Sequence, residues 1–139
     1  MIDAETSYKS LLFVTESLEQ LIGANGSKAV LRMAGQKAAT NLIDMLPLSL
    51  PEGEAVRRAG LLLVELGFMD EMSMLDADHL QVAGNHVLRE LHKLGLESTS
   101  SGGYYVVGLF EGFFRQLSDS TRKVVSMELK EGVEHWKLG

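Results

Sequence analysis

Apolar residues recur every three or four positions along most of the chain, the spacing that places them on one face of an α-helix. The run Gly23–Gly26 is expected to form a turn that ends the first helix, and Ser27 is placed to cap the second. Pro47 ends that second helix, because proline excludes its predecessor from the helical region. Gly67 should stop the third helix, and Asn85 should cap the fourth. The pattern predicts helices over residues 8–22, 28–46, 55–66, 86–94 and 104–117.

The period changes to two in the stretch after the third predicted helix. Met72 and Met74 alternate with polar neighbours, and Leu80 and Val82 do the same after the turn residues Asp76–Asp78. Alternation of this kind is typical of strands with one buried face. The stretch is therefore predicted to form a β-hairpin.

The end of the chain, KVVSMELKEGVEHWKLG, reads as a second hairpin around a two-residue turn, Glu131-Gly132. Glycine supplies the positive φ that tight hairpin turns require. Counting outward from the turn predicts the register, because each strand residue then has one partner. The expected pairs are Lys130 with Val133, Met127 with Trp136, Val125 with Leu138 and Glu128 with His135. The face that carries Met127 and Trp136 is expected to lie in the core, and the face that carries Glu128 and His135 is expected to be exposed to solvent.

Composition narrows the class of protein. The 139 residues are 45% hydrophobic and 23% charged, without a shift that would divide residues 1–139 into two domains. The net charge of −6 argues against nucleic acid as a partner. No cysteine is present, which excludes disulfides, thiolate metal sites and cysteine nucleophiles. MIDAETSYKS lacks the features of a secretory signal, and no apolar run is long enough to span a bilayer, so a cytoplasmic location is expected.

Catalytic and metal-binding motifs are not visible in the chain. The stretch GANGSK lacks the length and the ending of a phosphate-binding loop. His86 and Glu90 have i,i+4 spacing, but two residues leave a zinc ion short of ligands. Asp76 and Asp78 fit a turn better than a calcium loop. The sequence therefore predicts no enzyme activity, no metal and no cofactor.

The segment GGYYVVGLFEGFFRQL, residues 102–117, is the most apolar part of the chain. Gly108 and Gly112 lie four apart on one helical face, where they allow another backbone to approach closely. Two interpretations are open: a core helix lying across the sheet, or the same helix with a ligand cavity beside it. Glu111 either pairs with Arg115, its i,i+4 neighbour, or orients a ligand in that cavity.

YYVVGLFEGFFRQL, followed by a strand and the terminal hairpin, resembles the core of the 4-vinyl reductase domain family, which includes predicted hydrocarbon-binding proteins. ESLEQLIGANGSKAVLRMAGQ resembles the N-terminal part of those proteins. AGQKAATNLIDML and EAVRRAGLLLVELGFMDEM are similar to the related TRAPP subunits of vesicle tethering. The resemblance implies an α+β fold with helices packed on an antiparallel sheet of about four strands. It also implies a homodimer, with an apolar pocket between the long helix and the sheet.

The chain departs from this family at the positions of its metal ligands. Many members hold a structural zinc with one cysteine before the long helix and two in the terminal hairpin. The matching positions here are Gly103, Glu128 and Trp136, none of which supplies a thiolate. The lipid-modified cysteine of TRAPP subunits is also missing.

The function expected from these features is non-catalytic, sensory binding of a hydrophobic or aromatic molecule such as a hydrocarbon or a phenol-like compound. A second copy of the chain and a separate signalling protein are the expected partners. Methionine suits a wall that adapts to apolar ligands of different shape. The expected ligand-binding residues are Met72, Met74, Tyr104, Val107, Phe110, Glu111, Phe114 and Trp136.

Two alternatives remain open at this point. The first is a dimeric scaffold or interaction module whose core is filled by side chains. A cavity of roughly 300 Å³ or more beside residues 104–114 would favour ligand binding, and its absence would favour the scaffold. The second alternative, an accessory role in tetrapyrrole reduction, is suggested by the family name.

Overall fold

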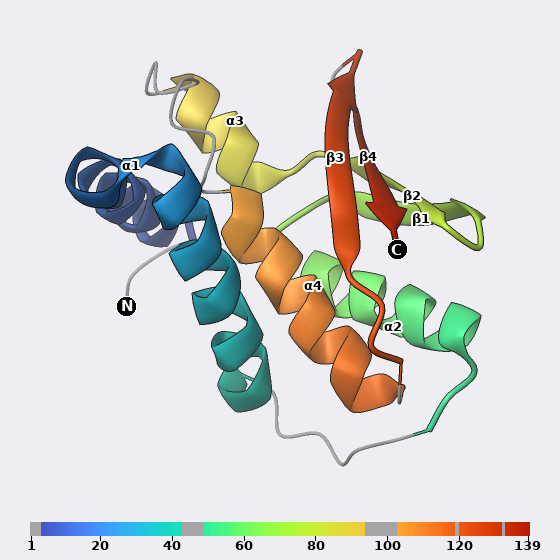
Figure 1. The fold of residues 1–139 in the computed structure, drawn as a ribbon. Helices are drawn as coiled ribbons and strands as arrows, with labels where there is room; N and C mark the ends of the chain where they lie inside the picture. The colour runs from blue at the N-terminus through green and yellow to red at the C-terminus, as the bar shows by residue number, and fades with distance from the viewer. Residues whose placement is uncertain (1–3, 43–48, 94–102, 119, 132) are drawn as a thin grey trace.

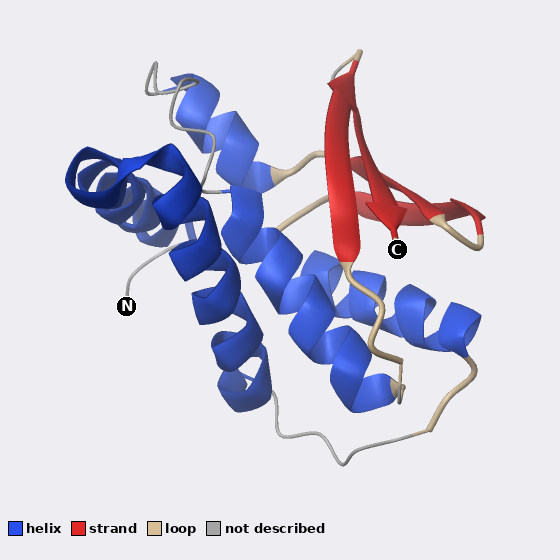
Figure 2. Cartoon of the chain, in the orientation of Figure 1, coloured by secondary structure: helices blue, strands red, loops and turns tan. Residues whose placement is uncertain are grey.

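The computed structural model describes residues 4–42, 49–93, 103–118, 120–131 and 133–139. The helices are α1 (Ala4–Leu42), α2 (Glu52–Glu65), α3 (His86–Lys93) and α4 (Gly103–Leu117). The strands are β1 (Glu71–Asp76), β2 (His79–Ala83), β3 (Val124–Lys130) and β4 (Val133–Leu138). Figure 2 shows the strands gathered beside the helices as one sheet. The predicted fold class, α+β with helices packed on a four-stranded antiparallel sheet, is confirmed.

The sheet has the order β1-β2-β4-β3, with antiparallel neighbours, so β1 and β3 are its edges. Three predicted pairs of the terminal hairpin are confirmed: Met127 with Trp136, Glu128 with His135, and Lys130 with Val133. The fourth pair is wrong, because an irregularity between Val124 and Ser126 places Val124 opposite Leu138. The extra residue, Val125, is 60% exposed. Gly132 of the predicted turn lies outside the described residues, and Glu131 has a φ of 53°.

Helix α4 lies in the middle of the molecule, with α1 along one side and the sheet on the other (Figure 1). Its apolar side chains reach the sheet, where Phe110 packs against the indole of Trp136. Helix α2 packs against α4 and β1. Phe110 and Trp136 are completely buried. Burial of such large apolar surfaces is the main favourable term in folding. The core therefore lies between α4, α2 and the inner face of the sheet.

The glycines of α4 serve its contact with α1. A Cβ added at Gly108 would overlap the carbonyl oxygen of Arg32, and one added at Gly112 would meet the side chain of Ala39. Gly35 of α1 is equally close to the backbone of α4 at Tyr105. The expected close approach at Gly108 and Gly112 is thus made by a helix, and small residues on both helices permit it.

Helix α1 changes direction at Gly23, whose φ of 82° and ψ of 167° are not helical. The predicted break lies at this position. The helix resumes directly afterwards, so the predicted turn is wrong for residues 24–26, which are helical. The predicted N-cap is also wrong, because Ser27 is buried inside α1. A single glycine with positive φ is enough to turn the chain, because glycine has no Cβ to oppose that conformation. Pro47, the predicted stop, lies outside the described residues.

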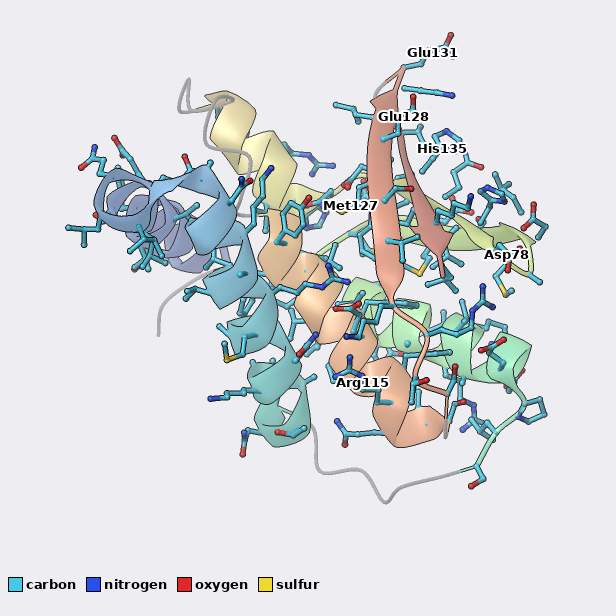
Figure 3. The ribbon with its side chains drawn as sticks, in the orientation of Figure 1. Asp78, Arg115, Met127, Glu128, Glu131 and His135 are labelled. Carbon is cyan, nitrogen blue, oxygen red and sulfur yellow. The ribbon has the colours of Figure 1, made fainter. Side chains whose placement is uncertain are left out.

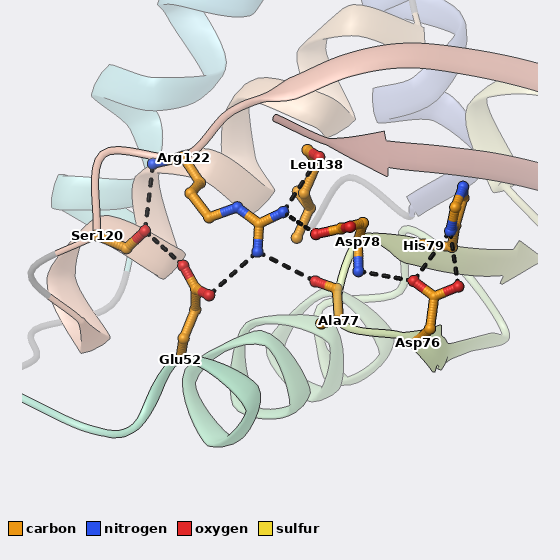
Figure 4. Close-up of polar contacts among 8 residues, drawn as sticks. All are labelled: Glu52, Asp76, Ala77, Asp78, His79, Ser120, Arg122 and Leu138. Atoms are coloured by element: carbon orange, nitrogen blue, oxygen red, sulfur yellow. Dashed lines mark hydrogen bonds and ion pairs between the residues drawn. The ribbon is translucent and has the colours of Figure 1, made fainter.

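Polar side chains fix the start of α3 and the turn between β1 and β2. Asn85 caps α3 as predicted, since its Oδ1 accepts the N–H of Val87 at 3.0 Å. Arg122 bonds Glu52, Asp78 and the carbonyl oxygens of Ala77 and Leu138, which joins α2, the β1–β2 turn and β4 (Figure 4). Asp76 accepts the N–H of Asp78 at 2.8 Å within the same turn. Asp76 ends β1 and Asp78 lies in the turn, so the prediction of turn residues is confirmed for Asp78.

Candidate functional site

Three predicted ligand-binding residues, Phe110, Phe114 and Trp136, lie in the core. At most 1% of the surface of each side chain is exposed. The ring of Phe110 stacks on Phe114 at 5.9 Å between centroids and meets the edge of Trp136 at 5.8 Å. Aromatic pairs at these separations stabilise one another beyond the burial of their area. The three rings fill the space between α4 and β4 with their own contacts.

The two predicted methionines lie on β1, at the sheet edge opposite β3. Met72 is half-buried beside Gly60 of α2, where a Cβ would come within 2.8 Å of its sulfur. Met74 is 40% exposed. The structure therefore separates both methionines from Tyr104 and Val107.

Tyr104 and Val107 do share a hollow, which we call the β3 cleft. It lies between α1, α4 and the start of β3 and has a volume of about 50 Å³. A hollow of this size accommodates one or two waters or a small polar group, because a water in the liquid occupies roughly 30 Å³. It is far smaller than the roughly 300 Å³ typical of sites that enclose a drug-sized ligand. Its lining residues are Arg32, Tyr104, Val107, Val124, Val125, Ser126 and Met127.

Glu111 bonds two lining residues of this cleft, Arg32 and Val124, and is 1% exposed. Its carboxylate accepts Arg32 Nε at 2.7 Å and Arg32 Nη2 at 2.5 Å, a bidentate ion pair. Gln36 Nε2 donates at 3.0 Å and the N–H of Val124 at 3.1 Å. The predicted pair with Arg115 is wrong, because Glu111 faces α1 whereas Arg115 is exposed near the end of α4 (Figure 3). Glu111 thereby joins α4 to α1 and β3.

The environment of Glu111 favours its charged form. Burial alone raises the pKa of this carboxyl, because a low-dielectric interior disfavours charge. The hydrogen bonds from Arg32, Gln36 and Val124, together with the positive charge of Arg32, outweigh burial and leave the pKa below its ordinary value. The bond to Glu111 in turn raises the pKa of Arg32. The pair is ionised at neutral pH.

A second buried carboxylate, Glu134, was missed by the sequence predictions. It is 6% exposed and accepts Asn85 Nδ2 at 2.7 Å and Trp136 Nε1 at 3.0 Å. Burial raises its pKa, and the two neutral donors offset only part of that rise. The strand pattern contained the signal, since residues two apart share a face. Glu134 therefore had to lie beside the buried Trp136.

The outer face of the terminal hairpin is polar, as predicted. Figure 3 shows Glu128, Glu131 and His135 near the tip of this hairpin, away from the helices. Of the three positions compared above with zinc ligands, Gly103 and Trp136 are buried, whereas Glu128 is exposed. Within the described ranges, no three histidine, cysteine or acidic side chains are grouped as a metal site would require.

His86 contacts Asp70 and the carbonyl oxygen of Gly67. The side chain of Glu90, its proposed i,i+4 partner, lies outside the described part of the chain. Asp70 also pairs with Arg89, at 3.0 Å. Asp70 therefore joins His86 and Arg89 in a network of surface polar contacts that anchors α3.

No protein-family model matches the chain, and no curated protein matches it. Among the described helices, none is both long enough and apolar enough to cross a bilayer.

Proposed function

We propose that the protein is a non-catalytic interaction module that pairs with a second copy of itself through the N-terminal part of α1. The observation that carries this proposal is an apolar stripe on that helix. Its residues are Ser10, Phe13, Val14, Ser17, Leu18 and Leu21, and we call it the α1 stripe.

The α1 stripe has the composition of a helix-docking surface. Its members recur at intervals of three and four and none is charged, which is the pattern of an amphipathic helix laid against a partner. Leu21 is 81% exposed, and Phe13 and Val14 are each more than half exposed. The stripe lines an open hollow of about 400 Å³. Large apolar side chains gathered in this way mark an interaction site on a soluble surface.

Several features favour a second copy as the partner. The dark-blue N-terminal part of α1 lies at the side of the molecule away from the sheet (Figure 1). Ser10 and Ser17 are seven residues apart, so two antiparallel copies can approach closely at the small residues while Phe13 and Leu21 fill the space between them. A two-fold axis would pair the same patch with itself, the commonest arrangement of oligomers. The homodimer expected from the family resemblance agrees with this arrangement.

The filled core supports an interaction module over an enclosed ligand site. Phe110, Phe114 and Trp136, which were predicted to line a ligand cavity, are buried against one another, and the β3 cleft has a volume of only about 50 Å³. Small-molecule binding is the second candidate, because Tyr104 and Val107 do line that cleft together. Its ligand would be held at the surface.

The mass of the protein in solution tests the dimer. The unchanged chain is expected to have twice the monomer mass of 15.2 kDa by light scattering at micromolar concentration. Leu21→Arg should shift it to the monomer, since a buried unpaired charge at the interface is costly. Leu75→Arg is the matched control, because Leu75 is also exposed but lies on β1. A monomeric unchanged chain, or equal dissociation by both variants, would refute the proposal.

A further inference from the structure

Lys28 is a cation placed beside the β3 cleft without an anion of its own. Its Nζ lies over the ring of Tyr104, 5.4 Å from the centroid. Among the residues that the structure describes, no carboxylate pairs with this ammonium group. A cation over an aromatic face is attracted by the ring but keeps its capacity to donate hydrogen bonds.

Arg32, the cation that lines the cleft itself, is neutralised. Its Nε and Nη2 are bound to Glu111, and Nη2 also donates to the carbonyl oxygen of Val124 at 2.7 Å. The pair Arg32–Glu111 contributes no net charge, so among the described residues Lys28, which lies over the lining residue Tyr104, is the cation left unneutralised beside the cleft. This is notable in a chain whose formal net charge is −6. The hydroxyl of Tyr104 has no hydrogen-bond partner in the described ranges, so it is a further donor at the same place.

Exposed apolar side chains follow the β3 cleft along the edge strand. Val107 and Met127 form the inner walls of the cleft. Val125, another lining residue, is 60% exposed. Leu129 is 62% exposed and shares the face of Met127, because the two residues are two apart on one strand. A head-group-sized hollow with one cation beside it is thus followed by exposed apolar side chains on the edge strand.

We propose that the β3 cleft binds a small amphipathic carboxylate, with its carboxylate group between Lys28 and Tyr104 and its apolar body along Met127 and Leu129. One unpaired cation matches a monoanion. A neutral alcohol would leave Lys28 uncompensated, and an amine would be repelled by it. This inference rests on small-molecule binding, the second candidate function, and is independent of the dimer.

Three probes with the same body separate the contribution of charge from that of apolar contact: phenylbutyrate, phenylbutanol and phenylbutylamine. Their affinities for the full chain are measured by ligand-observed NMR at low and high salt. We expect phenylbutyrate to bind about tenfold more tightly than phenylbutanol at low salt, and this difference to shrink at high salt, because ions screen exposed charges. Phenylbutylamine should bind most weakly.

Lys28→Gln and Lys37→Gln are the matched variants, since both lysines lie on α1 and Lys37 is exposed away from the cleft. Lys28→Gln should remove the preference for phenylbutyrate while its affinity for phenylbutanol stays unchanged. Lys37→Gln should bind all three probes as the unchanged chain does, and equal melting temperatures would show that both variants are folded. Equal affinities for acid and alcohol, an unaffected Lys28→Gln variant, or no binding of any probe would overturn the proposal. The last result in a chain that still dimerises would leave the interaction function standing.

Discussion

Glu111 and Glu134 are both buried carboxylates, but the groups around them differ in charge. Glu111 has a cation, Arg32, in a bidentate pair, and its pKa lies below the ordinary value. Glu134 has two neutral donors, Asn85 and Trp136, and its pKa lies above the ordinary value. The fraction of surface buried is similar, so burial alone does not decide whether a carboxyl in this protein is charged. The partners decide it.

The two carboxyls also have different mechanical roles. Glu111 bonds groups from α1 and β3, two elements far apart in the sequence, and its bonds end at the candidate cleft. Glu134 bonds its own strand and the cap of α3. Loss of the Glu111 contacts should therefore loosen the packing of α1 and the shape of the cleft. Loss of the Glu134 contacts should act on the terminal hairpin.

The largest effect is expected from Trp136→Ala. Trp136 is completely buried against Phe110 and donates to Glu134, so truncation removes core volume and one of the two donors to that carboxyl. Large aromatic deletions in cores cost about 3–5 kcal/mol of unfolding free energy. Urea denaturation measures the loss.

His135→Ala is the control for that experiment. His135 lies on the opposite face of the same strand, beside Glu128, and its loss should cost less than about 0.5 kcal/mol. Similar small losses in both variants would mean that the assigned core face of the hairpin is wrong.

Replacing Arg32, the cation paired with Glu111, is expected to have the next largest effect on stability. Arg32→Met leaves Glu111 buried and without its ion pair, which should cost about 3 kcal/mol of unfolding free energy. The double variant Arg32→Met/Glu111→Leu should be more stable than Arg32→Met alone, because no charge remains to be buried. Arg115→Met, on the exposed neighbour in the sequence, should cost less than about 0.5 kcal/mol. An equal cost for Arg32→Met and Arg115→Met would show that the Glu111 pair is not formed.

The smallest effect is expected in the pH dependence of the unfolding free energy, to which Glu111 and Glu134 contribute with opposite sign. A folded pKa below the unfolded value makes Glu111 stabilising above about pH 4.5, and this stability is lost as pH falls through the folded pKa. A folded pKa above the unfolded value gives Glu134 the opposite sign, with stability lost as pH rises from about 4.5 through the folded pKa.

Two conservative variants check these signs in denaturant melts at several pH values. Glu111→Gln should flatten the acid side of the stability profile, because the group that takes up a proton there is removed. Glu134→Gln should flatten the decline above pH 4.5. Identical pH profiles for the two variants would contradict the contrast between the sites.

Local patterns were sufficient to predict most elements of the fold. The two hairpins follow from alternation and turn residues, and three of four pairs in the terminal hairpin follow from counting outward from Glu131. The fourth pair could not be predicted by counting. Val124 binds Glu111 through its N–H and Arg32 through its carbonyl oxygen, and the strand is irregular at the next residue. These partners lie on other elements.

The candidate site was less accessible to sequence reasoning. Tyr104 and Val107 were assigned to one site and do share the β3 cleft, whereas Met72 and Met74 lie at the other edge of the sheet. Arg32 is 79 positions from Glu111, so no i,i+4 rule could indicate that pair.

Lys28 and the apolar stripe of α1 were missed for a related reason. Helical spacing shows which side chains share a face, but it does not show whether that face is covered. Leu21 is 81% exposed because no described element packs over it, and this depends on the tertiary arrangement rather than on local spacing.

The most direct measurement of the contrast between the two sites is a carbon-13 NMR titration of the glutamate carboxyls, assigned with the Glu111→Gln and Glu134→Gln variants. The structure predicts that Glu111 stays ionised down to a midpoint below 4.5 and that Glu134 titrates at a midpoint above 4.5. Midpoints in the reverse order, or a shared midpoint, would contradict the central claim that partners and not burial set the charge of these two groups.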